Sequence, residues 1–247
     1  MDPAYYVAAG SLKARAFHLE TLSNNLANAT TVGYKAEKSF FSLFDKASQS
    51  SRNLPLTPYV NAGTVLAHRG TDFEQGASRP TGRPLDMAIE GNAFFVLETP
   101  QGLRVTRDGR FQLGAGGRLE ALDGTPVRGK NGQPLRVDPN LGEPTIAPDG
   151  TLQQGLTVVG QLDLRAYADP RALRRVGANR FDPTGLAEAP VKATVLQGHQ
   201  ESSTVDIALV MVDMIRLNRL FELSMKVAST LTNDLDAKSI NDIAINR

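Results

Sequence analysis

"LSNNLANATTVGYK", residues 22–35 of a 247-residue chain, places polar side chains inside a helical pattern. Its two leucines are four residues apart, which puts them on the same face of a helix. Asn24, Asn25 and Asn28 lie among them, although asparagine is a poor helix former. Two interpretations stay open: Asn24 and Asn28 fix the register of an apolar seam between helices, or the asparagines form the frayed last turn of one helix.

The residues before this stretch predict an N-terminal helix. Asp2 can accept the free N–H groups of a first turn, and Pro3 at the first helical position loses no hydrogen bond. Apolar residues then recur in steps of three and four up to Leu26, a seven-residue repeat that favours a partner helix. We expect the β-branched residues 30–32 and Gly33 to end the helix.

The other end of the chain predicts a second, longer helix. Residues 203–206 have the pattern of a capping box, in which Ser203 serves the first turn and Asp206 reaches back to the N–H of Ser203. A 4-3-4-3 apolar spacing follows, and Ile215, Leu220 and Val227 widen the apolar stripe beyond a two-helix seam. This helix should therefore contact more than one neighbour.

Between the helices, turn residues predict a β domain. Of the 22 glycines, 20 lie within residues 63–198. Asp108-Gly109, Asp123-Gly124 and Asp149-Gly150 are each typical of a tight type I′ hairpin turn, and residues 94–97 predict a buried strand. The middle of the chain should therefore be mostly antiparallel.

Together these patterns predict an α+β fold. At about 1.5 Å per residue, helices of roughly 28 and 38 residues would extend about 40 and 55 Å, beyond a compact β domain. We expect the long N- and C-terminal helices to pair in a coiled-coil-like bundle that flanks a central, mostly antiparallel β domain. The expected parts are an N-terminal helix in 1–35, a linking segment in 36–72, the β domain in 73–198 and a C-terminal helix in 199–247.

Composition argues against catalysis and against several partners. The 27 Lys and Arg residues balance 26 Asp and Glu residues, so we expect no nucleic-acid binding, and no apolar run is long enough for membrane insertion. The chain has no cysteine, its three histidines lack metal-ligand spacing, and the glycines of residues 113–119 lack the lysine of a phosphate-binding loop. We expect no enzyme activity, no cofactor and no metal site.

Three separated motifs resemble the flagellar rod and hook proteins, the axial family of the bacterial flagellum. The opening stretch is similar to the family's N-terminal signature, and "GRPLDMAIEGNAFF", residues 82–95, to the start of its β domain. Residues 214–226 fit the C-terminal pattern Met-Ile-x-x-x-Arg-x-Phe-Glu-x-x-x-Lys. Short length and the Met1-Asp2 opening look most like a proximal-rod subunit. Where the family has Asp-Gly or Asn-Gly, this chain has Asn92-Ala93, so Asn92 or Gly91 should take the turn.

The resemblance implies a structural subunit of the basal-body rod. Terminal helices would form an inner tube, with the β domain facing outward, in a torque-transmitting periplasmic shaft. The implied partners are further copies, other rod proteins and the flagellar type III export apparatus, with no cleaved signal peptide and with peptidoglycan nearby. The alternatives are a distal-rod or hook subunit, and a periplasmic peptidoglycan-binding module or hydrolase, which the absence of Trp disfavours.

The apolar stripes and the asparagines are the residues that we expect at contacts between subunits. In the N-terminal helix they are Leu12, Leu19, Leu22, Asn24, Asn25, Leu26 and Asn28. In the C-terminal helix they are Val210, Met214, Leu217, Phe221, Ala228, Leu231 and Leu235.

Overall fold

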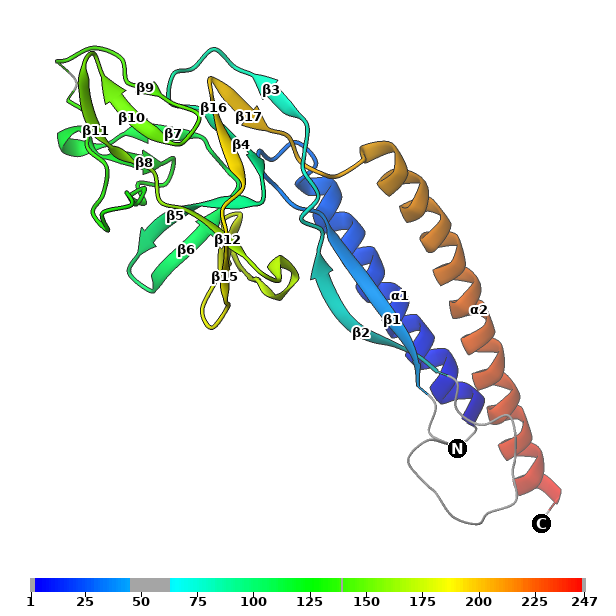
Figure 1. Cartoon of the computed structure of the whole chain (residues 1–247). Helices are drawn as coiled ribbons and strands as arrows, with labels where there is room; N and C mark the ends of the chain where they lie inside the picture. The colour runs from blue at the N-terminus through cyan, green and yellow to red at the C-terminus, as the bar shows by residue number, and fades with distance from the viewer. Residues whose placement is uncertain (1–2, 45–62, 139, 246–247) are drawn as a thin grey trace. The chain divides into compact units, whose positions relative to one another are not determined.

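The computed structural model describes residues 3–44, 63–138 and 140–245 (Figure 1). The chain separates into two compact units. The first, here called the terminal unit, consists of Met1–Ala27, Glu37–Thr71 and Asp206–Arg247. The second, the β unit, consists of Asn28–Ala36 and Asp72–Val205.

The terminal unit contains two helices and a β-hairpin. Helix α1 spans Pro3–Ala27 and helix α2 spans Ile207–Ile245. Strands β1 (Glu37–Phe44) and β2 (Gly63–Thr71) pair antiparallel beside α1, which contacts both strands as well as α2 (Figure 1). Neither helix, within the described residues, is long and apolar enough to cross a membrane.

The predicted coiled-coil-like bundle is wrong. The described residues contain only two α-helices, and α1 packs on a hairpin as well as on α2. Side chains fix this contact, because Asn25 Nδ2 donates to the carbonyl of Glu37 (2.8 Å) and the hydroxyls of Thr21 and Ser39 are 2.8 Å apart. A seven-residue apolar repeat shows that a helix face is covered, but not whether a helix or a strand covers it.

The end of helix α1 and the start of helix α2 differ in detail from the prediction. Helix α1 ends at Ala27, and the N–H of Thr31 donates to the carbonyl of Asn28 (3.1 Å) in the following turn. Helix α2 begins after Asp206, whose Oδ1 accepts from the N–H of Leu209 (3.1 Å). The predicted capping box is therefore wrong, since Asp206 itself provides the acceptor at the helix start.

The β unit is antiparallel throughout its paired strands. Its strands are β3 (Ser78–Pro80), β4 (Met87–Gly91), β5 (Ala93–Thr99), β6 (Gly102–Thr106), β7 (Phe111–Leu113), β8 (Leu119–Ala121), β9 (Thr145–Ile146), β10 (Thr151–Gln154), β11 (Thr157–Gln161), β12 (Leu164–Tyr167), β13 (Arg174–Gly177), β14 (Arg180–Asp182), β15 (Glu188–Ala189), β16 (Ala193–Gln197) and β17 (His199–Glu201). The largest sheet has the order β13-β14-β6-β5-β12-β15, and β9–β11 form a second sheet. The pairs β16–β4, β17–β3 and β7–β8 complete the unit with two 3₁₀ turns, Ala115–Gly117 and Pro170–Ala172.

Strand β5 divides the core of the β unit in two. Phe95 belongs to a large cluster that includes Phe111, whereas Phe94 belongs to a smaller one that includes Phe181. Successive side chains of a strand point to opposite faces, so the central strand supplies both clusters. The ring centroids of Phe95 and Phe111 are 5.1 Å apart in an edge-to-face arrangement.

The prediction of type I′ turns at the three Asp-Gly pairs of the β unit is wrong. Non-glycine residues with positive φ, among those described, are Ala178 and Asn179, so none of the three predicted turn aspartates qualifies. Asp149 instead accepts the N–H of Thr151 at Oδ1 (2.9 Å), a side-chain turn that an aspartate forms readily. Gly91, with φ at 115°, takes the turn before Ala93, which is one of the two positions that the sequence predicted.

Candidate functional site

The predicted interface residues of α1 differ widely in exposure. Leu22 and Asn25 are buried, and Asn24 is exposed. The remaining predicted positions of this segment are half-buried: Leu12, Leu19, Leu26 and Asn28. Asn25 is thus the asparagine that the structure buries, and its amide bonds to strand β1 as described above.

In α2 the predicted positions form the protected side of the helix. Leu217 is buried at 9% exposure. Half-buried side chains precede and follow it at Val210, Met214 and Phe221. Since α2 contacts α1, this side lies within the subunit itself. The side chains of the remaining predicted positions lie outside the described residues: Ala228, Leu231 and Leu235.

The other sides of α2 expose large apolar side chains that the prediction largely missed. Helical geometry sorts them into two stripes, because residues three, four, seven or eight apart share a face. The first stripe consists of Leu209, Val212, Leu220, Leu223 and Val227. The second stripe consists of Ile207, Met211, Ile215 and Met225. Leu209 is 61% exposed and Leu223 57%. Within the residues that the structure describes, one of the three apolar sides of this helix is covered by its own subunit and two are exposed.

The segment after α1, Asn28–Ala36, belongs to the β unit and is held there by close backbone contacts. Gly33 has φ at +65°, and its N–H donates to the carbonyl of Glu201 (2.7 Å). A Cβ at Gly33 would lie 2.5 Å from the carbonyl carbon of Arg107. Glycine is therefore required here both for its conformation and for the approach of two backbones.

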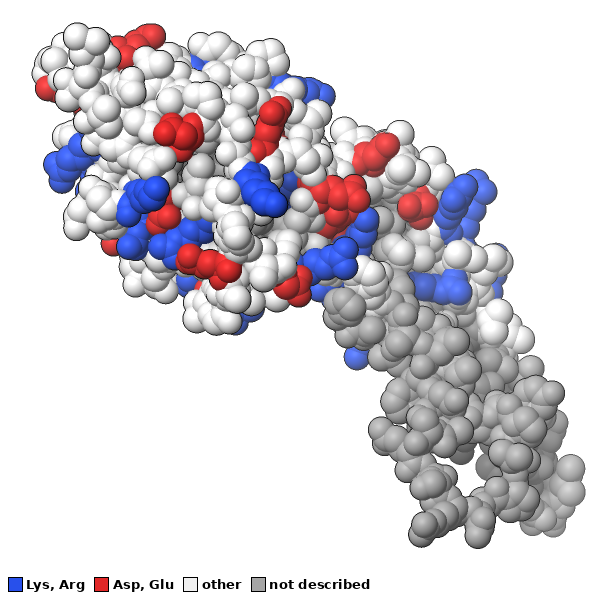
Figure 2. Space-filling view, in the orientation of Figure 1, with Lys and Arg blue, Asp and Glu red and all other residues white. Residues whose placement is uncertain are grey.

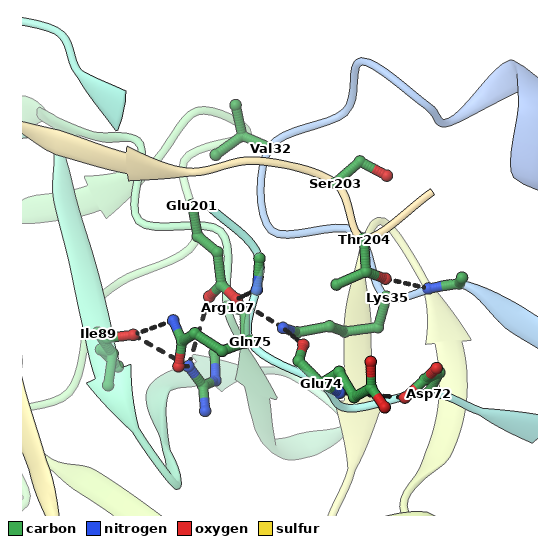
Figure 3. A network of polar contacts seen from close by, with 12 residues as sticks. Val32, Lys35, Asp72, Glu74, Gln75, Ile89, Arg107, Glu201, Ser203 and Thr204 are labelled. Atoms are coloured by element: carbon green, nitrogen blue, oxygen red, sulfur yellow. Dashed lines mark hydrogen bonds and ion pairs between the residues drawn. The ribbon is translucent and has the colours of Figure 1, made fainter. Parts of the chain in front are cut away.

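Three buried charged side chains form a cluster, here called the Lys35 cluster (Figure 3): Lys35, Glu201 and Arg107. Lys35 and Glu201 are both 0% exposed, and Lys35 Nζ lies 2.5 Å from Glu201 Oε1. Arg107 Nη1 lies 3.4 Å from Glu201 Oε2 and donates to the carbonyl of Ile89 (3.1 Å). Removing one partner of such a pair leaves a buried charge, which costs about 3–5 kcal/mol.

Backbone groups complete the surroundings of the cluster. Lys35 Nζ donates to the carbonyl of Glu74 (2.6 Å), and Glu201 Oε1 accepts from the N–H of Gly76 (2.8 Å). Burial lowers the pKa of Lys35, although Glu201 opposes that shift, and nearby Arg107 adds to it. Two cations share one fully buried carboxylate, which makes Glu201 the residue on which the cluster depends.

The turn between β13 and β14 also contacts the segment. Asn179 Nδ2 donates to the carbonyl of Val32 (2.7 Å). The guanidinium of Arg175 lies 4.6 Å from the ring centre of Tyr34, a cation–π distance, and donates to the carbonyl of Lys35. The last four residues of the signature "TVGYK" therefore each contact another part of the β unit through backbone or side-chain atoms.

These roles of the signature were not predicted from the sequence. Lys35 and Glu201 are 166 positions apart, and no local pattern marks the pair. The available signal was Gly33 followed by a tyrosine and a lysine, which suggests a special backbone conformation beside an apolar and a charged side chain. Arg107 had no signal beyond its place before an Asp-Gly turn.

Comparison with known proteins extends these observations. Three family profiles match: flagella basal body rod protein over residues 6–35, flagellar hook protein FlgE/F/G D1 domain over 88–154, and flagellar basal body rod FlgEFG protein C-terminal over 196–241. The flagellar basal-body rod protein FlgF of Mesorhizobium japonicum is 31% identical over 226 residues, which is 90% of each chain. The chain belongs to the flagellar basal-body rod protein family.

Further relatives agree with this assignment. FlgF of Caulobacter vibrioides is 32% identical over 228 residues, 90% of each chain. FlgG of Buchnera aphidicola is 29% identical over 253 residues, 93% of this chain and 96% of that protein. The resemblance to a flagellar basal-body rod protein is thereby confirmed, and a structural rod subunit is the function that the family gives. The rod profile ends at Lys35, and the C-terminal profile includes Glu201.

Proposed function

We propose that this rod subunit assembles through α2, whose two exposed stripes pack against helices of neighbouring rod subunits. The carrying observation is the exposed apolar surface on two sides of α2, including Leu209 and Leu223. Burial of a Leu, Ile, Val or Met side chain contributes about 1.5–3 kcal/mol, so even partial burial of the nine stripe positions supports a stable assembly. Soluble proteins rarely leave apolar patches of this kind without a partner.

In this proposal, one side of α2 makes contacts within the subunit and the other sides make contacts between subunits. Positions such as Leu217 hold α2 against its own subunit, and the stripes that begin at Ile207 and Leu209 face the neighbours. A helix with apolar residues on several sides is typical of a packed tube rather than of an isolated pair. Further copies of this chain and other rod proteins are the partners that such a tube requires.

The remaining features of the proposal come from the family. We place the rod in the periplasm, as a shaft that transmits torque, with the β unit facing outward and without a catalytic role. Export through the flagellar type III apparatus without a cleaved signal peptide belongs to the same proposal, as does a location close to peptidoglycan.

The test replaces Leu223 by aspartate and, as the matched control, by methionine. Because Leu223 is exposed, Leu223→Asp should leave the circular dichroism and thermal unfolding of the purified chain unchanged. In cells, the aspartate would have to be buried without a partner in each subunit of the rod. We expect basal bodies without a completed rod, hook or filament, whereas Leu223→Met cells swim normally. Full-length flagella in Leu223→Asp cells would disprove the proposed packing.

A further inference from the structure

The chain passes between the terminal unit and the β unit four times. The passages lie at residues 27–28, 36–37, 71–72 and 205–206. On the β-unit side, the N–H of Asp72 donates to the carbonyl of Ala36 (2.8 Å). The N–H of Ala36 donates to Oγ1 of Thr204 (2.8 Å). Residues beside three of the four passages are thus hydrogen-bonded to one another.

The fourth passage leads into the same set of contacts. It opens the segment Asn28–Ala36, in which the carbonyl of Tyr34 accepts from the N–H of Thr204 (3.1 Å). Gly33 donates to the carbonyl of Glu201 in the same segment. Three passages therefore begin from backbone that is bonded beside the Lys35 cluster, and the fourth opens the segment that contains Lys35 itself.

We propose that Lys35 and Glu201 are positioning residues that hold the β-unit ends of the four passages together as one rigid base. Force applied to the terminal unit then enters the β unit at one rigid base instead of at four independent chain ends. This mechanical role rests on the proposed function, whereas the local rigidity does not. The two can therefore be tested separately.

The geometry explains why an ion pair suits this place. Lys35 extends from the segment after α1 to the carbonyl of Glu74 and to Glu201, which stands three residues before Thr204 (Figure 3). Glu201 also accepts from Gly76. One salt bridge therefore joins three stretches of chain that are distant in sequence, and full burial excludes the water that would otherwise compete for these groups.

The first experiment measures amide hydrogen exchange of the full chain carrying Lys35→Met, with Lys130→Met as the matched control. Lys130 is an exposed lysine of the same unit. In Lys35→Met, the amides of Gly33, Ala36 and Thr204 should exchange roughly tenfold faster or more, because local opening becomes easier. The amide of Phe95 in the core should keep its rate, and Lys130→Met should change none of these rates.

Two results would overturn the proposal. Equal acceleration at Phe95 would mean that Lys35 supports only global stability, and unchanged rates at all three amides would mean that the pair does not hold the passages. If Lys35→Met does not fold, Glu201→Gln removes the charge, keeps the shape and should show the same ranking of amides. Its combination with Lys35→Met should cost less than the two changes added, since both remove one interaction.

The second experiment tests force transmission in cells. Lys35→Met cells should build flagella but lose swimming speed in viscous medium more steeply than Lys130→Met cells. An identical dependence on viscosity, together with faster local exchange, would overturn the mechanical role and leave the rigid base intact. Normal flagella in Leu223→Asp cells would instead disprove the proposed packing of α2, and the exchange result would still stand.

Discussion

In the β unit, Phe95 and Phe111 are fully buried, whereas on α2 of the terminal unit Leu209 and Leu223 are mostly exposed. Charged side chains of both signs are scattered over the face of the β unit that Figure 2 shows. Within this unit, Arg165 and Glu188 form one of the ion pairs. The β unit completes its core by itself. In the proposed assembly, neighbouring subunits cover the exposed sides of α2, so assembly should add to the stability of the terminal unit and leave that of the β unit unchanged.

The largest expected effect comes from Leu217→Asp, which places a charge on the covered side of α2. Leu217 is buried within the subunit, so an unpaired charge there costs about 3–5 kcal/mol. Limited proteolysis of the purified chain should then degrade the terminal unit rapidly and leave a resistant fragment within residues 72–205.

Leu223→Asp is the control for this prediction, because the same charge is placed on an exposed side of the same helix. Its digestion pattern should match that of the unmodified chain. Equal protease resistance of the Leu217→Asp and unmodified chains would show that α2 does not depend on its covered side. The comparison between the two units would then fail.

The two units also differ in how far the sequence predicted them. Apolar periodicity is local, so it found both helices and the strand that contains Phe95. It could not find the hairpin of β1 and β2, in which Glu37 pairs with Thr71 across a long separation. The bundle prediction failed for that reason: a face that needs covering does not name the element that covers it.

The Lys35 cluster escaped prediction for a related reason. Charged residues are mostly exposed, and a lysine becomes buried only when the fold brings a carboxylate to it. The pairing of β17 with β3 brings Glu201 to Lys35, and no local sequence pattern predicts that pairing. Turn positions were predicted more successfully than turn types, because Asp-Gly fits several turns.

A change of intermediate size tests the backbone requirement in the β unit. Gly33→Ala forces a side chain into positive φ, which costs about 1–2 kcal/mol, and adds a clash with the backbone of Arg107. Gly185→Ala is the matched control, since Gly185 has φ at 82° and nothing within 4 Å of an added Cβ. Each kcal/mol should lower Tm by roughly 2–4 °C.

Gly33→Ala should therefore lower the Tm of the β unit well beyond the fall caused by Gly185→Ala. The measurement is thermal unfolding followed by near-ultraviolet circular dichroism. Equal falls would show that the approach of Gly33 to Arg107 is not needed, and that the segment Asn28–Ala36 contributes little to the β unit.

The smallest expected effect concerns acid, and it should be confined to the β unit. Asp182 accepts hydrogen bonds from Thr184 Oγ1 (2.6 Å) and Arg174 Nη2 (2.8 Å), which lower its pKa to about 2. Because the folded pKa lies below the ordinary value of 3.8, this contribution is present above pH 3.8 and is lost as pH falls toward 2. Asp182→Asn should lower Tm at neutral pH, and its difference from the unmodified chain should shrink between about pH 4 and pH 2. Thr184→Val removes the first of these donors, so the contribution of Asp182 should be smaller and its loss should be complete at a higher pH. A Tm difference that stays constant from neutral pH to pH 2 would show that Asp182 stabilises the unit by packing, without a contribution from its charge.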